Sequence, residues 1–184
     1  MSRLQIPVSV EASPEASRAS LNAVAKSLGS VPNLFRVVGN SPAALKGYLG
    51  LSGAVSASSL DAKTQERLAL VVAESNGCNY CLSAHTYLGR NVAKLDDAEI
   101  TANRNGTSND VKAAAAVRFA AQVVEARGHV TDEQLAAVRD AGFSEAAVVE
   151  IVLAVALNTF TNYINEVAKT DIDFPVVAAR RIAA

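Results

Sequence analysis

The sequence predicts an all-α protein of short and medium helices. Half of its 184 residues are apolar and many of these are alanine, whereas aromatic residues make up 5% and tryptophan is absent. Alanine is the best helix former, and small side chains let helices pack closely. The alternating runs of β-branched residues that mark strands are missing, apart from a weak stretch in residues 4–10.

Start and stop signals divide the chain into its expected helices. The Ser-Pro pairs at 13–14 and 41–42 each join an N-cap side chain to a proline whose missing N–H costs nothing at the first helical position. The TDEQ sequence at 131–134 has the spacing of a capping box, and Gly29 and Gly142 stand where left-handed C-caps are expected. The expected helices are 14–28, 32–39, 42–57, 61–75, 78–91, 96–104, 109–127, 132–141 and 145–168.

Charge and hydropathy argue against binding to nucleic acid or to a membrane. The 17 basic and 18 acidic residues are scattered along the chain, for a formal net charge of −1. The opening MSRLQIPVSVEASPEAS lacks the apolar run of a signal peptide, and the later segment AAVVEIVLAVAL is interrupted by Glu150 and is too short to span a bilayer. We expect a soluble, cytoplasmic protein with one domain over residues 1–184, a length that buries a single core.

The helix ahead of the cysteines contains two glutamates on different faces. At about 100° per residue, Glu66 shares its face with apolar side chains, whereas Glu74 falls near Lys63 and Arg67. Glu66 is therefore expected to point into the protein. A buried carboxylate needs a partner, which is either an arginine of another helix or a neighbour in a functional site.

Residues 76–85, NGCNYCLSAH, contain both cysteines and one of the two histidines. The Asn-Gly pair breaks the helix and lets the chain reverse, which places Glu66 opposite His85 in an antiparallel helical hairpin. Cys78, Cys81 and His85 share one face of the second helix, with Cys81 and His85 one turn apart. Four polar, titratable side chains are thus expected to meet.

Three uses of this cluster can be compared. A structural zinc site needs four ligands, and beyond these three side chains the chain offers only His129, which lies in a distant GHVT loop. A permanent disulfide across so few residues removes little unfolded-state entropy. Redox chemistry fits better, because a helix N-terminus and an imidazolium at His85 both stabilise a thiolate, while Glu66 can orient the imidazole and exchange its proton. We expect neither a metal nor another cofactor.

The pattern Glu-x11-Cys-x2-Cys-x3-His that begins at Glu66 resembles the core signature of the AhpD-like alkylhydroperoxidases in the carboxymuconolactone decarboxylase superfamily. The flanks VPNLFRVVGNSPAAL and ALNTFTNYINEVAKTDIDFP are similar to its branch of uncharacterised peroxidase-related proteins, so the likeness covers about residues 20–177. It implies an AhpD-like helical fold with a CxxC-bearing hairpin, a CxxC core near 45–95, a C-terminal helical part near 96–184, and assembly into trimers or hexamers.

The resemblance also implies roles for individual residues. Cys81 corresponds to the cysteine that attacks the peroxide, Cys78 to the resolving cysteine, and His85 and Glu66 to the acid–base pair. The helix dipole alone favours Cys78, which is nearer the helix start, whereas proximity to His85 favours Cys81. Tyr80 stands where the best-known members have a histidine of their proton relay, and we expect it to be a packing or interface residue.

The predicted function is that of a thiol-dependent peroxidase that reduces hydroperoxides in antioxidant defence. The resemblance implies a lipoyl group on a protein arm as the reductant, and the aliphatic surroundings of the cysteines, without a basic cluster, favour such a dithiol over glutathione. One alternative is a non-enzymatic thiol switch. Another is a cysteine-independent decarboxylase or isomerase that uses Glu66 and His85, although decarboxylase members of the superfamily lack the cysteine pair.

A polar stripe marks the long C-terminal helix. It consists of Asn158, Asn162, Asn165 and Lys169. Asparagine inside a helix costs roughly half a kcal/mol relative to alanine, so a compensating contact is expected. The stripe either lies at a solvated or subunit surface or lines the redox pocket.

Overall fold

The computed structural model describes residues 2–180, and over that range the chain forms nine α-helices without a strand. The predicted all-α class is confirmed, and each helix begins and ends within two residues of its predicted position. The ends of the predicted domain, at residues 1 and 181–184, lie outside the described residues. In chain order the helices are α1 (Glu15–Leu28), α2 (Asn33–Val38), α3 (Pro42–Ser56), α4 (Ala62–Ser75), α5 (Asn79–Asn91), α6 (Asp97–Arg104), α7 (Val111–Glu125), α8 (Asp132–Asp140) and α9 (Glu145–Ala168).

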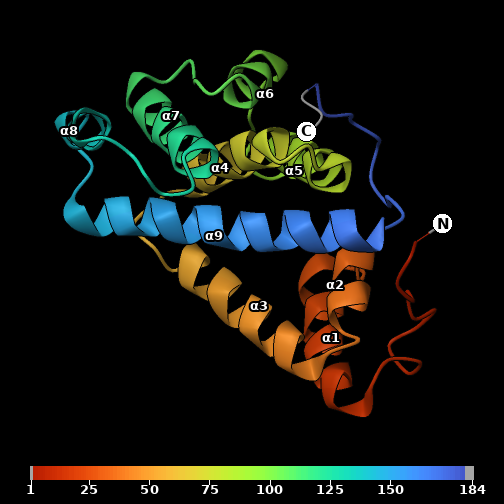
Figure 1. Ribbon diagram of the computed structural model, residues 1–184. Coiled ribbons are helices and arrows are strands. Elements are labelled where there is room, and N and C mark those ends of the chain that lie inside the picture. Colours follow the sequence, from red (N-terminus) through yellow and green to blue (C-terminus); the bar gives the residue numbers. More distant parts are fainter. Residues whose placement is uncertain (1, 181–184) are drawn as a thin grey trace.

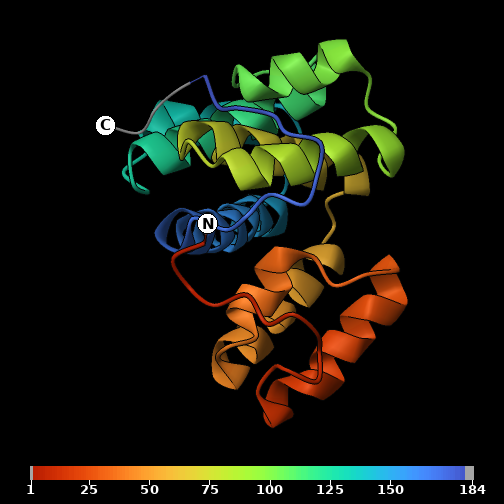
Figure 2. The same ribbon diagram turned by 90° about the vertical axis from the view of Figure 1, so that its right-hand side faces the viewer.

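Helix α9 runs through the middle of the molecule between two groups of helices. Helices α4 to α7 lie on one side of it and α1 to α3 on the other, as both views show (Figures 1 and 2). Its neighbours are α3, α4 and α7, with α2 and α5 near its C-terminal half. A residue on α9 can therefore reach helices that are far apart in the sequence.

The apolar segment that looked too short for a membrane span is part of this 24-residue helix. By length and composition α9 is the one helix among residues 2–180 that could cross a membrane. Its inner side contains buried asparagines and packs against α3, α4 and α7. These are the contacts of a core helix.

Helix α4 is surrounded by other helices, because α5, α6, α7 and α9 all pack against it. Residues 67–74 are buried without a break. Leu68 and Val72 belong to a hydrophobic cluster shared with α7 and α9, while Leu70 and Ala73 belong to a second cluster shared with α1, α3 and α5. The helix that carries Glu66 is thus held rigidly from several sides.

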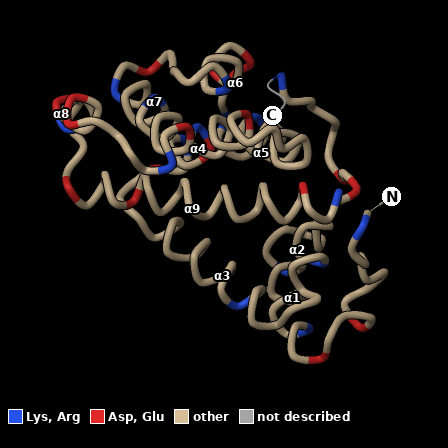
Figure 3. Tube along the Cα trace, in the orientation of Figure 1, with Lys and Arg blue, Asp and Glu red and all other residues tan. Residues whose placement is uncertain are grey.

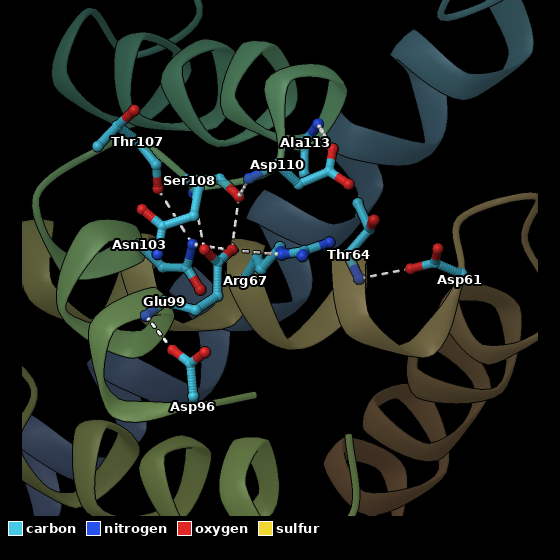
Figure 4. A network of polar contacts seen from close by, with 11 residues as sticks. Asp61, Thr64, Arg67, Asp96, Glu99, Asn103, Thr107, Ser108, Asp110 and Ala113 are labelled. Carbon is cyan, nitrogen blue, oxygen red and sulfur yellow. Dashed lines mark hydrogen bonds and ion pairs between the residues drawn. The ribbon is translucent and has the colours of Figure 1, made fainter. Parts of the chain in front are cut away.

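This packing overturns the expectation that Arg67 and Glu74 lie on a different, more polar face from the buried one. Arg67 is buried, and its Nε donates to Glu99 at 2.7 Å (Figure 4). Glu74 is buried as well and accepts from Arg104 at 2.6 Å. The periodicity distinguished the faces of α4 correctly, but the neighbouring helices α6 and α7 cover the polar face as well.

Most predicted helix ends are confirmed by their capping contacts. The Ser41 hydroxyl accepts from the N–H of Ala44, and the capping box at 131–134 is complete. Gly29 has φ +78° at the C-terminus of α1 and Gly142 has φ +87° after α8. The first signal differs, because Pro14 itself is the N-cap of α1 and no side chain caps that helix.

After α9 the chain continues as an extended segment, residues 169–180, that runs beside α5 (Figure 2). The Ser83 hydroxyl accepts from the N–H of Val177 at 2.9 Å, and the Asn79 side chain accepts from the N–H of Ala179 at 2.8 Å. Phe174 packs edge-on against Tyr80. The cysteine helix is therefore covered by a segment that is nearly a hundred residues distant in sequence.

Charged residues are spread around the outer helices and loops in mixed order, with few along α9 (Figure 3). Lys and Arg do not gather on one face over the described part of the chain. This distribution agrees with the scattered charges of the sequence.

Candidate active site

The turn between α4 and α5 reverses the chain as predicted. Asn76 ends α4, and Gly77 follows with φ +67°, a left-handed conformation that other residues adopt only with strain. Cys78 is the N-cap of α5, and its sulfur accepts from the backbone N–H of Cys81 at 3.3 Å. Both sulfurs therefore lie at the first turn of α5, beside the end of α4.

The predicted contact between Glu66 and His85 is present. The Nδ1 atom of His85 lies 2.9 Å from Oε2 of Glu66, and the two side chains are 22% and 21% exposed. Because a carboxylate can only accept, Nδ1 carries the proton and Nε2 is left for another partner. Burial lowers the pKa of His85, but the charge and hydrogen bond of Glu66, helped by Cys81, outweigh burial and raise it.

The two cysteines are buried and lie side by side as free thiols. Cys78 is 0% exposed and Cys81 is 2% exposed. The Cys78 thiol donates to the sulfur of Cys81 across 2.8 Å. The pair belongs to the hydrophobic cluster that also contains Leu70, Leu82 and Ala84, so its surroundings are aliphatic.

The environment makes the two thiols unequal. Burial disfavours the Cys81 thiolate, but hydrogen bonds from Cys78, Asn165 and Asn162 and the charge of His85 lower the pKa of Cys81 to about 7. The pKa of Cys78 is raised, because its proton is held by Cys81 and because it is buried. Cys81 is therefore the cysteine that ionises near neutral pH, which agrees with the choice based on His85 rather than on the helix dipole.

The middle of the α9 stripe reaches this site. The Nδ2 atom of Asn165 donates to the Cys81 sulfur at 3.3 Å. Asn162 accepts at its Oδ1 atom from Nδ2 of Asn76 at 2.9 Å, and its amide also lowers the pKa of Cys81. Of the two open interpretations, Asn162 and Asn165 therefore agree with the redox-pocket one.

The outer members of the stripe differ from these two. Asn158 is buried but donates to the carbonyl of Ala154 in its own helix at 2.9 Å. Lys169 is exposed and pairs with Glu166 at 2.6 Å. The solvated-surface interpretation is thus right for Lys169 alone.

Tyr80 is a buried packing residue, as expected. Its hydroxyl donates to Asp173 at 2.8 Å and accepts from the N–H of Leu34 at 3.1 Å. Burial raises its pKa further. Both bonds tie α5 to other segments, and neither leads toward Cys81.

The fold has been seen in other proteins. Among solved structures, the chain is similar to an alkylhydroperoxidase AhpD core, an uncharacterised peroxidase-related protein from Ralstonia eutropha JMP134, at 22% identity and a TM-score of 0.82, over 94% of this chain and 92% of that one. It is also similar to an uncharacterised peroxidase-related protein from Silicibacter sp. TM1040, at 19% identity and a TM-score of 0.78, over 93% and 94% of the two chains. No curated protein matches the chain.

A third similar structure is a cysteine-to-alanine variant of the debrominase Bmp8 in complex with 2,3,4-tribromopyrrole. Its identity is 20% and its TM-score 0.78, with 94% of each chain covered. Residues 42–126, which include the four predicted site residues, match the model of the carboxymuconolactone decarboxylase family. Over residues 42–126 the chain thus matches the carboxymuconolactone decarboxylase family, and its fold as a whole is that of the AhpD-like structures.

In this AhpD-like protein, one site residue escaped the sequence analysis. Asn76 was interpreted only as a helix breaker, yet its side chain holds the amide of Asn162. One signal for a further role was present in the sequence. Gly77 alone supplies the left-handed turn, so the turn does not explain why asparagine precedes it. The partner of Asn76 lies 86 residues further along the chain, so no local pattern links the two.

The cysteines line neither of two hollows on the surface of residues 2–180. One, of about 350 Å³, lies where α4, α7 and α9 begin. The other, of about 450 Å³, runs between the end of α7 and α9 and has Asn76 in its wall. Asn76 contacts Asn162, so the side chains of these two asparagines lie between the second groove and Cys81. His129, the remaining histidine, is exposed on the loop before α8.

Proposed function

We propose that the protein is a thiol-dependent peroxidase that reduces hydroperoxides at Cys81. The observation that carries this proposal is the pair of free thiols 2.8 Å apart, of which one has a pKa of about 7 and the other keeps its proton. A thiolate is the nucleophilic form of cysteine, and a protonated neighbour is ready to act in the next step.

The chemistry proceeds in two steps. The Cys81 thiolate attacks the terminal oxygen of R–O–OH, so that an S–O bond forms, the O–O bond breaks, and the departing alkoxide takes a proton from the His85 imidazolium. Cys78 then attacks the sulfenic acid at Cys81, which gives an internal disulfide and water. Glu66, bonded to Nδ1 of His85 at 2.9 Å, orients the imidazole throughout.

A reductant must then restore the two thiols. We propose a dithiol such as a lipoyl group, which transfers two electrons and two protons to the disulfide and becomes a disulfide itself. The cysteines lie among aliphatic side chains and are at most 2% exposed, which favours a slim, apolar arm over a charged tripeptide. A reducing, cytoplasmic compartment fits a cycle of this kind.

The donor can be tested by stopped-flow reduction of the purified disulfide form. Dihydrolipoamide is expected to react substantially faster than glutathione at equal thiol concentration. Equal rates, or a preference for glutathione, would rule out the lipoyl partner without affecting the peroxidase step.

The proposed activity is tested by peroxide consumption with an excess of dithiol. The wild type should consume many equivalents per site and Cys81→Ser none. Cys78→Ser should complete one oxidation and then accumulate sulfenic or sulfinic acid at Cys81, which mass spectrometry detects.

The same experiment separates the alternatives. A thiol switch would consume about one equivalent of peroxide per site and stop. A cysteine-independent decarboxylase or isomerase would persist in Cys81→Ser. Over-oxidation of Cys78 in Cys81→Ser would reverse the roles of the two thiols.

A second candidate function is reductive dehalogenation, which the likeness to the debrominase Bmp8 favours. In that reaction an aryl bromide and two thiols give the arene, a disulfide and HBr, so the cysteine pair supplies both electrons. Bromide release from a brominated pyrrole, measured beside peroxide consumption, compares the two substrates directly. The peroxidase proposal requires the peroxide to react faster.

A further inference from the structure

Two buried amide atoms beside Cys81 lack a well-aligned hydrogen-bond partner within the protein, although one of them, on Asn162, lies near enough to Cys81 to help lower the pKa of that thiol. They are Nδ2 of Asn162 and Oδ1 of Asn165, in side chains that are 0% and 2% exposed. A buried polar group without a partner destabilises the protein, so such groups are normally hydrogen-bonded. A donor and an acceptor left unpaired on the same face of α9, three residues apart, suggest a ligand with one donor and one acceptor.

The orientation of both amides is determined by their other contacts. The Asn76 amide donates to Oδ1 of Asn162 at 2.9 Å, which directs Nδ2 of Asn162 elsewhere. A thiolate can only accept, so Nδ2 of Asn165 faces the Cys81 sulfur at 3.3 Å and Oδ1 remains unpaired. Rotating either amide by 180° would place two acceptors or two donors against each other.

We propose that Asn162 and Asn165 bind the peroxide group itself, with Oδ1 of Asn165 accepting from the terminal O–H and Nδ2 of Asn162 donating to the oxygen that departs. This inference rests on the peroxidase proposal and names how that site holds its substrate. A hydroperoxide has one O–H donor and lone pairs on both oxygens, which matches the two unpaired atoms.

The arrangement favours the transition state over the bound substrate. As the Cys81 thiolate forms its S–O bond, the O–O electron pair moves onto the departing oxygen, and a donor at that oxygen stabilises the developing charge. The proton that completes the alcohol comes from His85. The Asn165 amide has a second task, because its Nδ2 stabilises the thiolate before attack.

The roles of the two amides can be distinguished by two measurements on the reduced protein. One is the second-order rate of Cys81 oxidation by a hydroperoxide, followed by stopped flow. The other is the rate of Cys81 alkylation by iodoacetamide as a function of pH, with the site identified by mass spectrometry. Alkylation needs the thiolate but has no departing oxygen for Asn162 to stabilise, so its rate at a pH where Cys81 is fully ionised is the reference for the peroxide reaction.

Asn162→Ala is expected to slow peroxide oxidation about 100- to 1000-fold, the range seen when one donor to a developing oxyanion is removed. Alkylation should change far less at a pH where Cys81 is fully ionised, although its profile moves to higher pH because Asn162 also lowers the pKa of Cys81. Asn165→Ala should slow both reactions and move the alkylation profile to higher pH. Asn158→Ala is the matched control, because Asn158 lies on the same stripe and bonds only within α9, and it should change neither rate.

A further variant covers the case in which Asn162→Ala does not fold. Asn76→Ala leaves Asn162 in place but frees its Oδ1 atom, and it should slow peroxide oxidation severalfold while alkylation is unchanged at a pH where Cys81 is fully ionised. Equal losses in both reactions, or wild-type peroxide rates in Asn162→Ala and Asn76→Ala, would overturn the amide assignment while the wild-type reaction stands. A wild-type Cys81 no faster with peroxide than a free thiol would overturn the proposed function and this inference together.

Discussion

At the scale of single residues, the contrast between Cys78 and Cys81 explains how one helix start gives only one readily ionised thiol. Both sulfurs lie at the N-terminus of α5, and Cys78 even accepts a backbone N–H. Two thiols 2.8 Å apart cannot both ionise, however, because like charges repel at that distance. The charge settles on Cys81, where His85 and Asn165 stabilise it.

This leads to a pH prediction. Because the pKa of Cys81 is lowered to about 7, its thiolate and hence its alkylation rate should rise through pH 7, well below the range of an ordinary thiol. Glu66→Gln removes the carboxylate that raises the pKa of His85, so the imidazolium is lost at lower pH and the Cys81 profile should move to higher pH. Iodoacetamide kinetics between pH 5 and 10 measure both.

His129→Ala is the control for this prediction, because His129 is the other histidine and is exposed on the loop before α8. It should leave the profile unchanged. A Glu66→Gln profile identical to that of the wild type would show that the Glu66–His85 pair does not act on Cys81.

At the scale of elements, the buried ion pair between α4 and α6 holds the helix that carries Glu66. Glu99 accepts from Arg67, Asn103 and Ser108 side chains and from the backbone N–H of Asn109 (Figure 4). Burial opposes its ionisation, yet these bonds lower the pKa of Glu99 from the usual 4.5 to about 2. The carboxylate therefore stabilises the fold fully above about pH 4.5 and progressively less toward pH 2.

Glu99→Gln should accordingly lower the free energy of unfolding by about 3–5 kcal/mol at pH 7, because it leaves Arg67 buried without its counter-ion. Its stability should also depend less on pH between 5 and 2 than that of the wild type. Urea unfolding at several pH values measures both effects. The matched control is Glu145→Gln, which removes an exposed ion pair to Arg139 and should change stability little. Equal losses in the two variants would contradict the buried network.

The extended C-terminal segment is a second element whose attachment can be tested. Tyr80→Phe keeps the ring against Phe174 but removes the hydroxyl that bonds Asp173 and the N–H of Leu34. It should cost about 1–3 kcal/mol, as expected for buried partners left unpaired, and increase hydrogen exchange in residues 170–180.

Tyr87→Phe serves as the control, since Tyr87 packs against the same Phe174 ring from an exposed position. Peroxide turnover should survive in both variants. A loss of turnover in Tyr80→Phe at unchanged stability would instead make Tyr80 a member of the proton relay.

At the scale of the whole molecule, one face of α9 exposes apolar side chains along its full length. These are Val149, Val152, Ala156, Tyr163 and Val167, which fall within about 60° of one another around the helix. An exposed apolar stripe of this extent is typical of a subunit interface. We predict a trimer or hexamer in solution, with this stripe buried between subunits.

Light scattering of the purified protein measures the assembly. Val152→Glu and Tyr163→Glu should each shift it toward the monomer, because a carboxylate would be buried without a partner. Val111→Glu is the control, since Val111 is exposed at the start of α7, away from the stripe. A stable monomer of the wild type at micromolar concentration would contradict the prediction.

The sequence by itself determined the helices and the contact between Glu66 and His85, because both depend on short-range signals. Caps, glycines with positive φ and the 3.6-residue period act within a few residues. Glu66 and His85 lie on consecutive helices that are joined by one tight turn. The surroundings of Arg67 and Glu74 were misjudged, since amphipathic periodicity shows which face is polar but not whether another helix covers it.

Only the tertiary structure decided which amides lie beside Cys81. Asn165 lies 84 residues from Cys81 and Asn162 lies 86 residues from Asn76, and these distances are closed by the packing of α9 against α4 and α5. Helix packing depends on the shape of whole surfaces rather than on any local pattern. The composition of the thiol site was thus encoded locally, whereas the pKa of Cys81 and the amides proposed to hold its substrate arise from the fold.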